Sequence, residues 1–231
     1  MMDITSPQNP RVKHIVKLRE DKRQRQKDGL LLVEGYDEIQ LAIVSGHKPQ
    51  TLLTAPELVS RPLTFSSAET LTVSRTVFEK MSYRDNPDGW LAVFPIPQTN
   101  LESSSLLDGV SPPLVIVAES IEKPGNLGAI IRSAAAFGYG AVLLGGKTAK
   151  ANSPKVARAS MGAIYRINIL HVKNLAAALI GLKECGYKVH GLDMDGTPIE
   201  ELNAAVPYCM VVGSEGAGLS KEVRAVLDST V

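Results

Sequence analysis

The sequence predicts an α/β protein with two domains: a small N-terminal α/β domain over residues 1–95 and a C-terminal domain with a parallel sheet over residues 114–231. Three observations lead to this prediction. Short apolar runs alternate with segments of helical periodicity along the chain. Residues 96–113 are rich in proline and serine, which is typical of a linker. Residues 114–138 have the pattern of a buried strand, a tight loop and a helix.

The composition is that of a globular protein. Hydrophobic residues make up 44% of the 231 residues, and the formal net charge of +1 excludes a polycation. No apolar run approaches the roughly 18–20 residues that span a bilayer, and the polar start lacks a signal-peptide hydrophobic region. We therefore expect a cytoplasmic protein without membrane contact. Cys185 and Cys209 show neither CxxC spacing nor a histidine at metal-ligand spacing, so we expect no disulfide, no metal site and two buried thiols.

The N-terminal segment is locally basic, with eight Lys or Arg against four Asp or Glu in residues 1–30. Turn residues at 6–10 precede a predicted amphipathic helix over residues 11–27. Its cations either bind RNA phosphates or form a solvated helix face. The candidate RNA-binding residues are Arg11, Lys13, Lys17, Arg23 and Arg25.

Short strands and helices complete the N-terminal domain. Trp90 and Phe94 lie in its last strand, where an aromatic side chain more often packs in a core than stacks on a base. The predicted strands cover residues 30–35, 51–54, 71–73 and 90–94, and the predicted helices cover residues 36–45 and 76–81.

The C-terminal domain begins with the strand at 114–119 and the helix that follows Pro124. Asn126 is a predicted N-cap, and Gly138 suits a left-handed C-terminal cap. The apolar face of this helix is predicted to contain Ile130, Ile131, Ala134, Ala135 and Phe137. Arg132 is predicted on the opposite face, towards the carboxyl ends of the strands, where open α/β sheets bind ligands. The alternative is an ordinary crossover unit with a solvated arginine.

Further strands and helices alternate down to the C-terminus, which indicates a parallel sheet with helices on its faces. The predicted strands cover residues 140–144, 166–170, 187–192 and 208–212, and the predicted helices cover residues 153–160, 174–185 and 221–227. His171 and His190 lie at strand ends and are interpreted as structural.

A glycine-rich loop, residues 213–218, follows the last of these strands and contains Glu215. Glycines allow the backbone to approach a planar or adenosine-like group, so the loop predicts a bound cofactor. Alternatively, Glu215 only complements the positive end of the next helix.

These stretches carry a family resemblance. Residues 124–138 resemble the first motif, and residues 212–220 the second motif, of the SpoU (TrmH-like) RNA 2′-O-ribose methyltransferases of the SPOUT superfamily. Residues 158–163 also match, and residues 6–35 are similar to that family's substrate-binding domain. Two spaced motifs in the expected order are far more specific than either motif alone.

The resemblance implies a trefoil-knotted domain that binds S-adenosylmethionine, usually as a homodimer. It assigns Asn126, Arg132 and Glu215 to catalysis and Gly213, Gly216 and, by position only, Leu192 to cofactor binding. The family's third motif is expected after Val231, so we expect the chain as given to stop short of it and the knot to be incomplete.

The chemistry requires an activated ribose 2′-hydroxyl in line with the sulfonium methyl group. Because a guanidinium stays protonated, the expected role of Arg132 is to hold a phosphate and stabilise the developing alkoxide. The favoured hypothesis is therefore an RNA methyltransferase, with ribosomal RNA favoured over transfer RNA. Two alternatives remain: a non-catalytic RNA-binding or ribosome-assembly protein, and a nucleotide-dependent enzyme of another kind.

Overall fold

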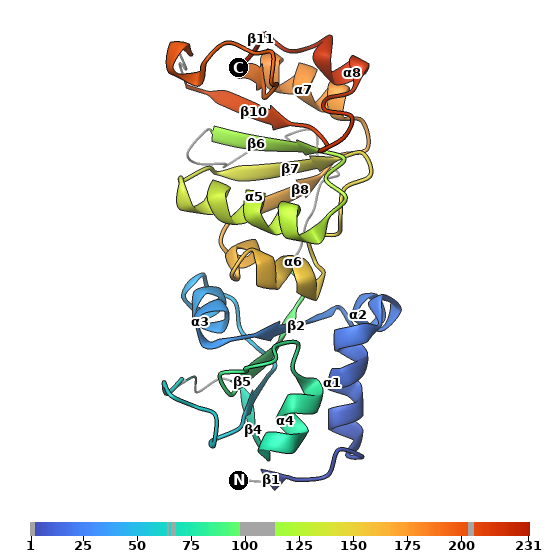
Figure 1. The fold of residues 1–231 in the computed structure, drawn as a ribbon, viewed down its shortest axis with the longest axis vertical. Helices are drawn as coiled ribbons and strands as arrows, with labels where there is room; N and C mark the ends of the chain where they lie inside the picture. The colour runs from blue at the N-terminus through green and yellow to red at the C-terminus, as the bar shows by residue number, and fades with distance from the viewer. Residues whose placement is uncertain (1–2, 64, 66–67, 98–113, 203–205) are drawn as a thin grey trace. The chain divides into compact units, whose positions relative to one another are not determined.

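The structure is a computed structural model that describes residues 3–63, 65, 68–97, 114–202 and 206–231. The chain forms two compact units (Figure 1). Unit 1 contains Met1–Pro97 and Asn152–Arg166, and unit 2 contains Gln98–Ala151 and Ile167–Val231. Most of the predicted linker lies outside the described residues. The segment 152–166 leaves the C-terminal sheet between two of its strands and packs in unit 1.

Unit 1 contains a mixed five-stranded sheet in the order β1-β4-β3-β5-β2. The strands are β1 (Asp3–Ile4), β2 (Leu30–Glu34), β3 (Thr51–Thr54), β4 (Glu69–Val73) and β5 (Trp90–Pro95). β5 runs antiparallel to both β2 and β3, whereas β4 runs parallel to β1 and β3. The helices are α1 (Pro10–Glu20), α2 (Lys22–Asp28), α3 (Tyr36–Val44), α4 (Arg75–Met81), α6 (Pro154–Ala159) and the 3-10 turn η1 (Ala163–Tyr165).

The two faces of this sheet are covered by different helices. Alternate β2 residues Leu30 and Leu32 share one core with apolar side chains of α1 and α4. Leu31 and Val33, which are also buried, point to the other face, on the side of α3. Trp90 and Phe94 are buried as well, which agrees with a packing role for both aromatic side chains.

The basic helix predicted over residues 11–27 is two helices. Asn9 caps α1, and α1 ends at Glu20. The next residue, Asp21, has an extended backbone, and its side chain accepts a hydrogen bond from Arg23 N at 2.7 Å. Asp21 therefore caps α2. The prediction of one continuous helix was wrong because it followed the spacing of apolar residues and ignored this local capping signal.

Unit 2 contains a six-stranded sheet in the order β11-β9-β10-β6-β7-β8, and every pairing in it is parallel. This confirms the predicted parallel sheet. The strands are β6 (Leu114–Glu119), β7 (Ala141–Gly145), β8 (Asn168–His171), β9 (Lys188–Gly191), β10 (Tyr208–Val212) and β11 (Ser229–Thr230), and the helices are α5 (Pro124–Ala136), α7 (Leu175–Glu184), α8 (Lys221–Arg224) and the 3-10 turn η2 (Ile199–Glu201).

Helix α5 differs from its prediction at both ends. Its N-cap is Lys123 and Pro124 begins the helix, so Asn126 is the third helical residue and not the cap. Gly138 has the expected left-handed backbone with φ 74°, but Phe137 is 79% exposed. Ile131 and Ala134 are buried as predicted, Ile130 and Ala135 are only partly buried, and Leu127 completes the buried face.

The described residues contain no helix long and apolar enough to cross a membrane, and no group of acidic, histidine or cysteine side chains with the arrangement of a metal site. Cys209 is buried as predicted, whereas Cys185 is exposed because it follows the last turn of α7. His190 donates or accepts at Nδ1 with Ser229 Oγ (2.9 Å), but its buried Nε2 has no partner among the described residues.

Candidate active site

The candidate site lies where the β6 and β10 strands end. These neighbouring parallel strands pair Ala118 with Val212, so the loops that follow them leave the same edge of the sheet. A pocket of about 300 Å³ opens between the two loops. It is lined by Ser120, Ile121, Glu122, Lys123, Asn126, Ser214, Glu215 and Gly216.

The first loop is fixed to the end of β7. Ser120 has a left-handed backbone with φ 55°, its N–H donates to Gly145 O at 3.0 Å, and its Oγ accepts from Lys147 N at 3.2 Å. A non-glycine residue in this conformation is uncommon and is often found at functional sites. The loop thus leads directly into α5 and brings Lys123 and Asn126 to the pocket.

The second loop is a tight hairpin. Ser214 N donates to Gly218 O at 3.1 Å, and Gly218 N donates back to Ser214 O at 3.0 Å. A Cβ atom on Gly213 would lie 2.3 Å from the Gly218 carbonyl carbon, so only glycine fits there without a backbone shift. Glu215 and Gly216 therefore form the tip of this hairpin.

Glu215 joins the two loops across 89 residues of sequence. Asn126 Nδ2 donates to Glu215 Oε1 at 2.5 Å, and the Lys123 ammonium pairs with the other carboxylate oxygen. The bond from Lys123, followed by the bond from Asn126, lowers the pKa of the Glu215 carboxyl below its ordinary value. Glu215 is therefore ionised at neutral pH, and its partners are in the first loop rather than at the start of α8, which Ser220 caps.

The orientation of the Asn126 amide follows from this contact. An ionised carboxylate only accepts hydrogen bonds, so the NH₂ group of Asn126 must face Glu215. The Asn126 Oδ1 atom then points away from the carboxylate, and no described residue donates a hydrogen bond to it. The pocket lining consequently combines the oriented acceptor of Asn126 with the Lys123 ammonium and two carboxylates, those of Glu215 and Glu122.

The other predicted site residues lie outside the pocket lining. Arg132 is exposed on α5, six residues beyond Asn126, which corresponds to about 9 Å along the helix axis. Gly213 packs against the backbone of Gly218 at the base of the hairpin. Leu192 follows β9 and has 38% of its surface exposed. Leu192 N donates to Val211 O at 2.8 Å, which keeps it beside the end of β10.

Sequence reasoning missed Lys123 as a pocket residue, together with Ser120, Ile121, Glu122 and Ser214. The available signal was a lysine directly before the Pro124 turn, opposite in charge to Glu215 in the second motif. Nothing in the spacing of the two loops indicated that these charges meet.

The predicted RNA-binding residues of unit 1 fall into three groups. Lys13, Lys17 and Arg23 are exposed. Arg11 is half exposed and forms an ion pair with Glu69 at 2.6 Å. Arg25 is only 9% exposed, and its guanidinium donates to the carbonyls of Leu18 (2.7 Å) and Arg19 (3.0 Å). Arg25 therefore holds α2 against the end of α1, in addition to contributing a positive charge.

Comparisons with known proteins place these features in one family. Residues 113–231 match the model of the SpoU rRNA Methylase family, and residues 9–92 match the MRM3-like substrate binding domain. The 23S rRNA (guanosine(2553)-2′-O)-methyltransferase RlmP of Bacillus subtilis is 29% identical over 231 residues, which is 100% of this chain and 88% of that protein.

Two solved structures are also similar along the whole chain. A crystal structure of an RNA 2′-O ribose methyltransferase has a TM-score of 0.82 and 31% identity, covering 100% of this chain and 88% of that one. An AdoMet-bound rRNA methyltransferase from Sinorhizobium meliloti has a TM-score of 0.80 and 26% identity, covering 99% and 87%. Since the family model matches more than half of the chain and includes the loops that form the pocket, this protein belongs to the SpoU rRNA methylase family.

Proposed function

We propose that this protein transfers a methyl group from S-adenosylmethionine to a ribose 2′-hydroxyl of ribosomal RNA. The single observation that carries the proposal is the contact of Asn126 with Glu215 in one pocket at the carboxyl ends of β6 and β10. The matched relative from Bacillus subtilis supports ribosomal RNA as the substrate class. The structure from Sinorhizobium meliloti, which contains AdoMet, supports the methyl donor.

The residues at the ends of β9 and β10 fit an adenosyl group. Leu192 and Met194 expose apolar side chains, with 38% and 99% of their surfaces accessible, and Gly213 leaves no side chain above the strand end. We assign Gly213, Gly216 and Leu192 to holding the methyl donor. When bound, S-adenosylmethionine supplies an electrophilic methyl group on a sulfonium.

Asn126 is the residue assigned to the ribose. Its Oδ1 atom accepts a hydrogen bond from the 2′-hydroxyl, because Glu215 holds the NH₂ end of the amide. Glu215 is a positioning residue, since its lowered pKa makes it a weak base. Lys123 fixes the carboxylate from the other side. Orientation of the nucleophile is thus built into the pocket before the RNA arrives.

Arg132 is assigned to the phosphate next to the reacting ribose and to the alkoxide that develops there. A guanidinium remains protonated at any physiological pH, so it contributes charge and a planar set of donors rather than a base. The substitution Arg132→Lys keeps the charge and removes the fork. Near-complete methyl transfer by this variant would contradict the assignment.

The remaining parts of the proposal concern organisation. We propose an RNA-binding domain over residues 1–95, a linker over 96–113 and a methyltransferase domain of the SPOUT type over 114–231, in a cytoplasmic homodimer. Exposed apolar side chains of unit 2, among them Phe137 and Ile180, support a second copy.

The decisive test is methyl transfer to RNA from cells that lack the gene. Purified protein, tritiated S-adenosylmethionine and deproteinised ribosomal RNA are expected to give label in an alkali-resistant dinucleotide, because a 2′-O-methyl group blocks cleavage of the adjacent linkage. Transfer RNA from the same cells serves as the control. Absence of label in both RNAs, with saturable RNA binding retained, would contradict the proposal and favour a scaffold function.

A further inference from the structure

A segment of the methyltransferase sequence contributes to the surface of unit 1. Residues 152–166 lie within the range that matches the SpoU family model, but α6 packs against β2 and η1 packs against α3. Tyr165 is buried between His47 and Phe94, with ring centroids 4.9 and 5.1 Å away. Gly162, with φ 80°, lies so close to α3 that a Cβ atom would come 2.8 Å from Glu38 O. This packing fixes the position of Arg158 on unit 1.

Two other arginines converge on Tyr83 in the same unit. The Tyr83 hydroxyl donates to the backbone carbonyl of Arg19, and the Arg25 guanidinium donates to that same carbonyl at 3.0 Å. The Arg19 guanidinium carbon lies 5.8 Å from the centre of the Tyr83 ring. Burial raises the pKa of the Tyr83 hydroxyl, and the charges of Arg25, Arg19 and Arg158 all act against that rise. Arg158 therefore shares the electrostatic environment of the other two.

The carboxylates in this region compensate only part of the positive charge. Glu20 pairs with Arg19 at 2.5 Å. Glu34 is buried, and Ser82 Oγ (2.5 Å) and Tyr83 N (2.7 Å) donate to it. No carboxylate oxygen of the described residues lies within 4.0 Å of a guanidinium nitrogen of Arg25 or Arg158.

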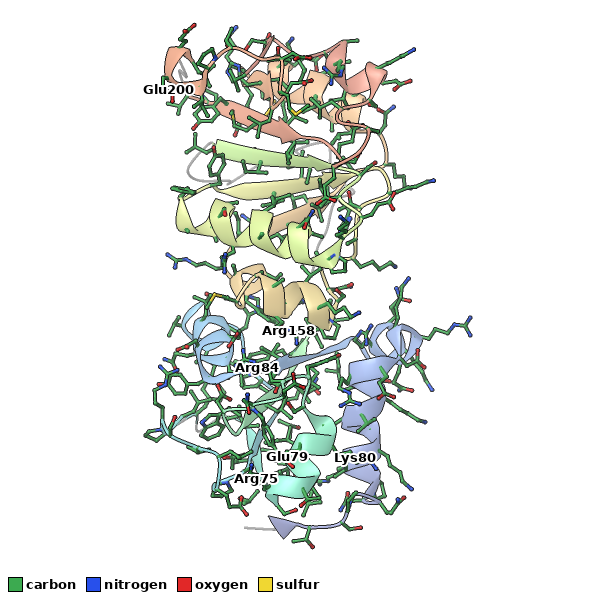
Figure 2. The ribbon with its side chains drawn as sticks, in the orientation of Figure 1. Arg75, Glu79, Lys80, Arg84, Arg158 and Glu200 are labelled. Carbon is green, nitrogen blue, oxygen red and sulfur yellow. The ribbon has the colours of Figure 1, made fainter. Side chains whose placement is uncertain are left out.

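Arg158 on α6 and the exposed cations of α2, two helices that both contact β2, present the accessible part of this charge. Arg158 is exposed on α6, and Figure 2 shows its side chain leaving α6 on the side of β2. Helix α2 also contacts β2, and its side chains Lys22, Arg23 and Lys27 are exposed. A buried charge that lacks an ionic partner, such as Arg25, favours an anion at the adjacent surface.

We propose that Arg158 and the exposed cations of α2 form one binding surface for the phosphodiester backbone of RNA, with Arg25 as a fixed charge beneath it. The inference rests on the proposed function in taking RNA as the substrate. Arg158 lies in the range that matches the SpoU family model, whereas α2 lies in the range that matches the substrate-binding domain. The proposed surface therefore combines residues of both matched ranges. A guanidinium with five donors suits a phosphate, which it binds through two oxygens.

The test compares Arg158→Ala with Arg166→Ala, which removes the same charge from an exposed position in the same segment. Binding of the full chain to a fluorescein-labelled RNA hairpin is measured by anisotropy over a series of salt concentrations. One phosphate contact contributes about 0.9 to the slope of log K against log salt for a duplex. Arg158→Ala is therefore expected to bind about eightfold more weakly at 0.1 M salt and to converge with the wild type near 1 M. Arg158→Lys is expected to retain the slope.

Each outcome either supports or overturns the inference. Equal affinity and equal slope for the two alanine variants would overturn it. So would competition by polyglutamate as strong as that by unlabelled RNA, since this would indicate an acidic protein partner. Circular dichroism melting of both variants identifies a folding defect, and Arg158→Gln, which removes the charge but keeps a long polar side chain, then replaces Arg158→Ala in the comparison. Methyl transfer by the wild type is assayed separately, so failure of the proposed reaction is distinguishable from failure of this surface.

Discussion

Gly213 and Gly216 belong to the same hairpin but differ in what a methyl group would meet, which gives a matched pair of substitutions. A Cβ atom on Gly213 would lie 2.3 and 2.4 Å from the carbonyl carbon and oxygen of Gly218, and 2.6 Å from Leu219 N. All three atoms are backbone, so no side-chain rotation relieves the overlap. A Cβ atom on Gly216 meets nothing within 4 Å, and the Gly216 backbone lies outside the left-handed region.

The expected effects therefore have opposite signs. Gly213→Ala must open the hairpin, and overpacking of this kind costs about 1–3 kcal/mol. For a unit of this size, about 4 °C per kcal/mol gives a fall in Tm of roughly 4–12 °C. Gly216→Ala restricts the unfolded chain without strain and is expected to leave Tm unchanged or to stabilise by up to about 1 kcal/mol.

Differential scanning calorimetry of the full chain measures both effects, and a urea titration checks that the m-value is unchanged. Because Gly213 supports the hairpin that carries Glu215, methyl transfer by Gly213→Ala is also expected to fall at temperatures where the variant is still folded. Equal Tm values for Gly213→Ala and the wild type would refute the reasoning, since the close approach of Gly213 to Gly218 would then have no energetic consequence.

Three further predictions concern catalysis, pH and packing. Asn126→Ala is expected to lower kcat about 100-fold, and Glu215→Gln is expected to lower it less, because each variant loses an oriented contact in the pocket. The far-ultraviolet circular dichroism of both variants should stay unchanged. A kcat equal to that of the wild type in either variant would contradict the assigned roles. Burial lowers the pKa of His190, so the unfolded chain binds more protons than the folded chain below the ordinary histidine pKa of about 6.5. The free energy of unfolding should therefore fall as pH decreases through that range and stay level above it, and His190→Gln should flatten this dependence in urea titrations. The buried hydroxyl of Tyr165 has no hydrogen-bond partner among the described residues, so Tyr165→Phe should stabilise the protein by about 1 kcal/mol, and a lower Tm would show that the hydroxyl is satisfied in solution.

Much of the fold is predictable because its signals are local. The five apolar residues at 114–118, the glycine at 138 and the alternation of strands and helices identify the parallel sheet and α5 without tertiary information. The two-residue strands β1 and β11 are too short to show a periodicity, and sequence analysis missed both. Phe137 was wrongly expected to be buried because helical spacing does not identify where the last turn leaves the sheet.

The site is predictable only in part. The two motifs identify Asn126 and Glu215 separately, and parallel strand order explains why they meet. The partnership of Lys123 with Glu215 depends on the precise path of two loops, which no local pattern encodes. The same holds for Arg25, where burial against Leu18 and Arg19 depends on the break between α1 and α2.

The packing of residues 152–166 in unit 1 has a consequence for protein engineering. A chimera that replaces residues 1–97 with a foreign RNA-recognition module would remove His47 and Phe94 and leave the Tyr165 ring facing solvent. A single boundary at the linker therefore does not separate the two units of this protein. A functional swap needs a second and a third junction, near Ala151 and Ile167, so that residues 152–166 are exchanged together with the domain in which they pack.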